Sequence, residues 1–154
     1  MKLLFLALMV FATRLLAGPE SIAIIVDKDC TLQELSLADL RAILHCEKVV
    51  SPNRAKWIVV LRQKNSPEHQ ALLKAVYKCS ADDLEAYFRM GEFNGSIDPV
   101  PKIVPSPVLV RRIVAGNVSA IGSVRLSEVT DAIKILRIDG LLPSDANYPI
   151  KTAE

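Results

Sequence analysis

Short apolar runs that alternate with well-marked helix starts constrain the fold of this chain most. Ile22 to Val26 (IAIIV) and Trp57 to Leu61 (WIVVL) are continuous and rich in β-branched residues, as is typical of strands buried on both faces. Ser119 to Gly122 and Ile133 to Ile138 predict two further strands. Because helices separate these runs, we expect mostly parallel pairing through right-handed crossovers. The pattern predicts a single three-layer α/β domain with a mostly parallel sheet.

Serine residues mark the starts of the predicted helices: Ser36, Ser66, Ser80 and Ser106. A serine hydroxyl at this position accepts a hydrogen bond from a backbone N–H group of the first turn, which has no partner inside the helix. Proline follows two of these serines, and proline suits the first helical position. We expect the helix after Ser66 to continue to about Cys79, and the helix after Ser80 to stop at Gly91.

The first 17 residues have the order of a secretory signal peptide. Lys2 supplies the positive start, Leu3 to Ala12 is an unbroken apolar run, and Ala17 is a small residue at the expected cleavage point. The run is shorter than the roughly 20 apolar residues that span a bilayer. We expect cleavage after Ala17, a periplasmic or secreted location, and one domain over residues 18–154; a retained anchor is the alternative.

The small positive charge of the chain belongs to this leader. Lys and Arg number 19 against 17 Asp and Glu, and the leader holds Lys2 and Arg14 but no acid. The rest of the chain is therefore neutral and has no overall electrostatic attraction for nucleic acid or an anionic membrane. We expect no nucleic-acid partner.

The three cysteines leave their pairing open. An exported chain meets oxidising conditions, in which a disulfide forms. Cys46 and Cys79 both end predicted helices and are the candidate disulfide pair, while Cys30 then stays free or pairs outside the chain. Geometry decides whether the pair forms. His45-Cys46 is the one adjacent pair of ligand residues, whereas structural zinc sites use several close pairs, so we predict no metal site.

Catalytic patterns are absent from the sequence. His45 and His69 stand in no recognisable motif, and the chain has no GxSxG, HExxH, P-loop or GxGxxG pattern. An enzyme would need His45 or His69 beside a nucleophile such as Ser123. We predict no catalytic residues and no cofactor, and a function other than catalysis.

One position in the sequence combines the features of a ligand-binding site. Arg62 follows a predicted strand, and Asn65-Ser66 opens the next helix. Ligands of α/β proteins bind where the carboxyl ends of parallel strands meet helix starts, and arginine donates charge-assisted hydrogen bonds to anions. Arg62, Asn65 and Ser66 are therefore the candidate ligand-binding residues. Ser66 fits a plain helix N-cap as well, and the residues alone favour that simpler interpretation.

Four segments resemble the phosphate-binding proteins of ABC importers, which have a type-II periplasmic-binding-protein fold. They are Leu35 to Ile43 (LSLADLRAI), Leu84 to Gly95 (LEAYFRMGEFNG), Ala115 to Gly122 (AGNVSAIG) and Ile135 to Ile150 (ILRIDGLLPSDANYPI). Their order and spacing, from about Ile22 onward, are similar to those of the second lobe of that family.

The resemblance implies an exported binding module of one lobe. In the family a Ser-Gly-Thr anion loop follows the arginine, and Asn65-Ser66-Pro67 stands at that place here. The expected ligand is phosphate or another small oxyanion, and the expected partner is a membrane transporter or another protein. The alternative is an exported interaction or sensor module that kept the fold and lost the ligand; such a module would expose a contiguous apolar patch.

Overall fold

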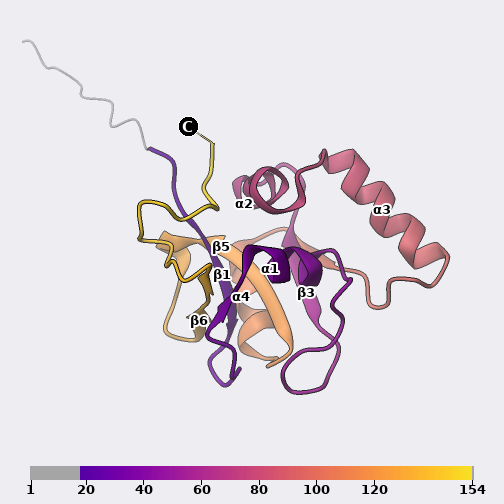
Figure 1. Ribbon diagram of the computed structural model, residues 1–154, viewed down its shortest axis with the longest axis horizontal. Coiled ribbons are helices and arrows are strands. Elements are labelled where there is room, and N and C mark those ends of the chain that lie inside the picture. The colour runs from indigo at the N-terminus through magenta and orange to yellow at the C-terminus, as the bar shows by residue number, and fades with distance from the viewer. Residues whose placement is uncertain (1–17, 154) are drawn as a thin grey trace, which may run out of the picture.

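A computed structural model describes residues 18–153 and contains one central sheet (Figure 1). The strand order is β4-β3-β5-β1-β6. The strands are β1 (Ile22–Asp27), β3 (Ile58–Arg62), β4 (Lys102–Val104), β5 (Ala120–Arg125) and β6 (Ile133–Ile135). None of the helices within these residues is both long enough and apolar enough to cross a bilayer. The predicted signal peptide, residues 1–17, lies outside the described residues.

The sheet is mostly parallel, as predicted, apart from one interior strand, β1. β3 runs parallel to both β4 and β5, whereas β1 runs antiparallel to β5 on one side and β6 on the other. Four strands therefore point one way and β1 opposes them, so the prediction of parallel pairing is wrong for β1. The apolar run of β1 indicates burial on both faces, and an interior strand is buried in this way whichever direction it runs.

Helices cover both faces of the sheet, which confirms the three layers (Figure 1). Alternate residues of β1 enter separate cores: Ile24 packs with α1 (Leu37–Leu44) and α2 (Pro67–Leu72), while Ile25 packs with α4 (Pro107–Ala115). Side chains alternate across a strand, so one continuous apolar run supplies both layers.

Each predicted helix starts where its serine stands. The Oγ atoms of Ser36, Ser66, Ser80 and Ser106 accept hydrogen bonds from the backbone N–H three residues later, with N···O distances of 3.0 to 3.3 Å. The helix after Ser80 is α3 (Ala81–Phe93). The helix predicted to reach Cys79 ends earlier. Its α-helical part, α2, passes into a π-helical turn, η1 (Leu73–Tyr77), which Lys78 ends with φ 54°.

Gly91 has a different role from the predicted one. α3 continues through Gly91 to Phe93, so the glycine does not stop the helix. A Cβ atom at position 91 would lie 2.3 Å from Cδ1 of Ile97. The glycine is therefore needed because the chain after α3 folds back against the helix at this point.

The last predicted strand, Ile133 to Ile138, is divided. β6 ends at Ile135, and the chain then turns away as β7 (Arg137–Ile138). β7 pairs in parallel with β2 (Glu34–Leu35), a short strand that the sequence did not indicate. β5 extends beyond the predicted Gly122 and leads into the 3₁₀ turn η2 (Leu126–Glu128).

The predicted disulfide between Cys46 and Cys79 is wrong. Both residues, like Cys30, carry free thiols. Burial raises the pKa of the Cys46 thiol to about 11, so this group stays protonated at neutral pH.

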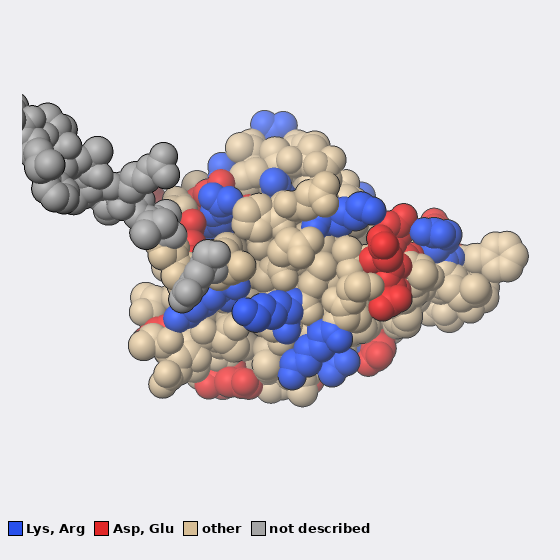
Figure 2. Space-filling model, turned by 90° about the horizontal axis from the view of Figure 1, so that it is seen from above, with Lys and Arg blue, Asp and Glu red and all other residues tan. Residues whose placement is uncertain are grey.

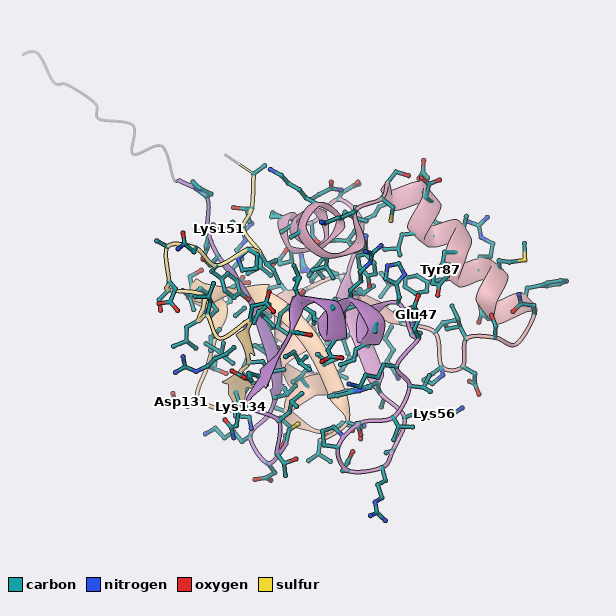
Figure 3. The ribbon with its side chains drawn as sticks, in the orientation of Figure 1. Glu47, Lys56, Tyr87, Asp131, Lys134 and Lys151 are labelled. Atoms are coloured by element: carbon teal, nitrogen blue, oxygen red, sulfur yellow. The ribbon has the colours of Figure 1, made fainter. Side chains whose placement is uncertain are left out.

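Two tyrosine hydroxyls, in place of the predicted disulfide, link the end of α1 to η1 and α3. The Tyr77 hydroxyl donates to the Leu44 carbonyl at 3.0 Å, and the Tyr87 hydroxyl donates to the His45 carbonyl at 2.9 Å. Figure 3 shows Tyr87 reaching from α3 toward the chain near Glu47. The His45 ring lies between the two tyrosine rings, with centroid distances of 5.0 and 5.4 Å. These bonds satisfy carbonyl groups that have no partner at the end of α1.

Candidate functional site

A groove of about 950 Å³ lies beside the carboxyl end of β3. The residues that follow β3 and the first turn of α2 form one wall, and α3 forms the opposite wall. The segment leading into β4 closes one side, through Val100, Pro101 and Ile103. This groove is lined by all three residues that the sequence predicted as ligand-binding: Arg62, Asn65 and Ser66.

Arg62 is the last residue of β3, and only one of its donors has a protein partner. Its NH1 group donates to the Pro105 carbonyl at 3.3 Å. Its Nε atom is buried and has no hydrogen-bond partner among the described residues. Arg62 makes no ion pair with a described carboxylate. A guanidinium group has five N–H donors in a rigid fork, so this side chain keeps most of its capacity to bind an anion.

Ser66 and Asn65 differ in exposure. Ser66 is buried, and its hydroxyl accepts from the His69 backbone N–H at 3.2 Å. The N-cap interpretation of Ser66 is therefore confirmed, although its hydroxyl hydrogen remains available as a donor. Asn65 is exposed on the groove wall. A role of either residue toward a ligand stays a prediction.

The α3 wall is apolar at its base and charged toward solvent. Leu84 is buried and Phe88 is half-buried, and both line the groove. Glu85 pairs with Arg89 at 3.0 Å and lies 3.9 Å from Nζ of Lys64. An apolar floor with a few polar groups is the usual composition of a small-molecule site.

The formal charge of the groove lining is positive by one. Three cations, Arg62, Lys64 and Arg89, stand against the carboxylates of Glu85 and Glu92. His69 also lines the groove. Burial lowers the pKa of His69, and a hydrogen bond with the Arg62 backbone acts in the opposite direction. Since burial has the larger effect, His69 is neutral at pH 7 and adds no charge.

Glu68, in the first turn of α2, does not offset this positive charge. Its carboxylate is buried and lies 4.0 Å from the Nε atom of Arg125 at the end of β5. Glu68 is not part of the groove lining. Its negative charge is therefore directed toward Arg125 and away from a groove ligand.

Among residues 18–153, Ser123 is not hydrogen-bonded to either histidine. It is buried, and its hydroxyl has no hydrogen-bond partner in this part of the chain, whereas an activated nucleophile would be coupled to a base. Burial also raises the pKa of the Cys79 thiol. No group of three His, Cys, Asp or Glu side chains in the described part of the chain is placed to hold a metal ion.

Several solved structures with a similar fold are described as phosphate-binding or phosphate transport proteins. A protein from Clostridium perfringens, assigned as a phosphate ABC transporter substrate-binding protein and solved with bound phosphate, matches with a TM-score of 0.71 and 20% identity. The match covers 53% of that protein and 87% of this chain. The chain has the fold of one lobe of a phosphate-binding protein. This finding confirms the resemblance at the level of fold.

Two further structures agree with this result. An ABC-type phosphate transport receptor from Vibrio cholerae matches with a TM-score of 0.68 and 18% identity, and PstS from Borrelia burgdorferi with 0.67 and 16%. Each match covers 87% of this chain, and 54% and 55% of those proteins. The chain therefore spans about half the length of these structures. No protein-family model matches the sequence, and no curated protein matches it either.

The candidate residues predicted from the sequence lie on one wall of the groove, and the α3 wall was not predicted. Arg62, Asn65 and Ser66 were recognisable because a strand end and a helix start are local features. The α3 wall comes from Leu84 and Phe88, whose apolar stripe was visible in the sequence. What this stripe faces depends on how α3 returns across the molecule.

Proposed function

We propose that this chain is an exported substrate-binding module that binds phosphate or another small oxyanion in the groove at Arg62, for ABC-type uptake. The proposal rests on the unused hydrogen-bond donors of Arg62. This residue lines a groove, uses one donor on the Pro105 carbonyl, and has no carboxylate partner among the described residues. A guanidinium in this state can donate two parallel hydrogen bonds to an oxyanion.

The surroundings of Arg62 support an anionic ligand. The groove lining has one more cation than anions, and the neutral His69 leaves this balance unchanged at pH 7. Ser66 adds a hydroxyl donor at the same wall. The apolar floor formed by Leu84 and Phe88 lowers the local dielectric constant, which strengthens hydrogen bonds to a charged ligand.

The proposed partner and location follow from the proteins that share the fold. Those proteins are described as phosphate transport receptors and substrate-binding proteins of ABC transporters. We propose that this chain likewise delivers its ligand to a membrane transporter. We also propose that residues 1–17 direct export to the periplasm or the exterior.

A second candidate function is an exported interaction or sensor module without a ligand. One observation favours it: Tyr87, Met90 and Phe93 form a stripe on α3, and Phe93 is 89% exposed. A contiguous row of exposed apolar side chains often marks a protein-binding surface. The two functions differ in what they require of Arg62, since an interaction module does not need it to bind an anion.

The test is a calorimetric titration of residues 18–154 with phosphate at low salt, with sulfate as the comparison. Arg62→Ala should weaken binding by at least about 100-fold, because it removes two charge-assisted hydrogen bonds of about 1.5 kcal/mol or more each. Arg112→Ala is the matched control, because Arg112 is exposed on α4 across the sheet. Equal affinity in the parent and Arg62→Ala would remove Arg62 from the site. No heat with either anion would favour the interaction module.

A further inference from the structure

We propose that two copies of this chain associate through the face that carries η1 and the start of α3, related by a twofold axis lying in the interface. This proposal goes beyond ligand binding and concerns a different set of residues. It is argued from the charges that two neighbouring segments of this face present.

The first segment is basic. Lys74 lies on η1 and Lys78 ends it, and both side chains are exposed. Neither lysine forms an ion pair with a described carboxylate. Figure 2 looks onto the molecule from the side of α2 and shows Lys and Arg side chains spread across the middle of this face.

The second segment is acidic. Asp82 and Asp83 lie in the first turn of α3 and are exposed. The side chain of Asp82 is 89% exposed, and its one ion pair, with Lys64, is long at 3.7 Å. In Figure 2 a strip of acidic side chains crosses the face at the base of its protruding part, next to the region of cations. Exposed pairs of this kind contribute little within one molecule, so both acids remain available to a partner.

A face with adjacent regions of opposite charge is complementary to itself. When a second copy is turned over about a twofold axis in the plane of the face, its acidic region lies opposite the basic region of the first, and the reverse pairing forms at the same time. Attraction then occurs on both sides of the axis. A different partner would have to match both regions separately, which is why we assign the surface to a second copy.

The shape between the two segments fits this pairing. A shallow hollow of about 540 Å³ lies beside η1, and Leu73, Lys74, Lys78 and Ala81 are in its lining. In the twofold arrangement, the first turn of the partner's α3 lies opposite these lysines and enters the hollow. Its two aspartates then meet Lys74 and Lys78 in a partly dry setting, where charge pairs are less screened than on an open surface.

Charge reversal tests this arrangement. The double variant Lys74→Glu, Lys78→Glu makes both regions acidic, and Asp82→Lys, Asp83→Lys makes both basic. Each variant alone should lose self-association, with a dimer dissociation constant raised at least tenfold. An equimolar mixture of the two should form mixed dimers, because both cross-pairings are again of opposite sign. Sedimentation velocity of residues 18–154 at low salt, at up to about 0.5 mM for a weak interface, measures all three states.

The outcomes separate this proposal from the anion site. None of the four substituted residues lines the Arg62 groove. Asp82 lies 3.7 Å from Nζ of the groove residue Lys64, so phosphate binding is measured in the Lys74→Glu, Lys78→Glu variant, where it should persist. Circular dichroism checks the folding of both variants. A parent chain that stays monomeric, or single variants that dimerise as well as the parent, would overturn the interface. Association with an acidic or basic protein in place of a second copy would overturn it too. A dimer without phosphate binding would refute the proposed function and leave the interface standing.

Discussion

Replacing Gly91 with alanine tests how α3 is held beside the groove. The added Cβ atom would lie 2.3 Å from Cδ1, 2.5 Å from Cγ1 and 3.0 Å from Cβ of Ile97. Rotation of the Ile97 side chain moves its outer atoms but not its Cβ. Ile97 is also buried, so relief requires a shift of the backbone that follows α3.

The expected magnitude comes from two opposing effects. Overpacking a buried site costs about 1–3 kcal/mol, whereas alanine favours a helix interior over glycine by about 1 kcal/mol. We therefore expect Gly91→Ala to lower the free energy of unfolding by up to about 2 kcal/mol. At an exposed helical glycine the same change would raise it by about 1 kcal/mol.

Urea denaturation of the variant gives this free energy directly. A second variant, Ile97→Ala, identifies the cause, because it removes the two closest atoms. The double variant should be more stable than the sum of the two single effects predicts, by about 1 kcal/mol. A Gly91→Ala protein that is more stable than the parent, or additive effects in the cycle, would refute the close approach of α3 to Ile97.

Three further predictions follow from the described contacts. Ser66→Ala should lower the free energy of unfolding by about 1 kcal/mol, since it removes the N-cap of α2; an unchanged urea midpoint would contradict this. Cys46 and Cys79 should both be alkylated in unreduced, denatured protein, and mass spectrometry showing a bridge would contradict the free thiols. Burial lowers the pKa of His45 and His69 below 6.5, so the unfolded chain binds more protons below that pH and stability should decline from about pH 6.5 downward. Urea midpoints across this range test it, and His69→Gln should weaken the decline.

Local features of the sequence predicted most of the elements. The serine N-caps and the apolar runs of β1 and β3 are recognisable because each depends on a few neighbouring residues. The direction of β1 was not recognisable, because an apolar run has the same pattern in either direction. The same limit applies to Gly91, where a stop signal and a close approach both require glycine.

Residues far apart in sequence account for the remaining errors. The disulfide was predicted because Cys46 and Cys79 both follow helices, but both thiols are free. The Tyr77 and Tyr87 hydroxyls bond the carbonyls at the end of α1 instead, and these contacts join residues far apart in sequence. In the groove, Arg62 was found from its place after a strand. Its free donors and its Pro105 contact depend on how β4 returns beside β3.

The central claim is that an oxyanion binds at Arg62, and a phosphate titration followed by NMR tests it most directly. Backbone amide signals of isotopically labelled residues 18–154 report both whether phosphate binds and where. The account predicts saturable shifts concentrated at residues 62–66 and on the groove side of α3, with none of comparable size on α4 across the sheet. Shifts centred elsewhere, or no shifts at phosphate concentrations well into the millimolar range, would contradict it.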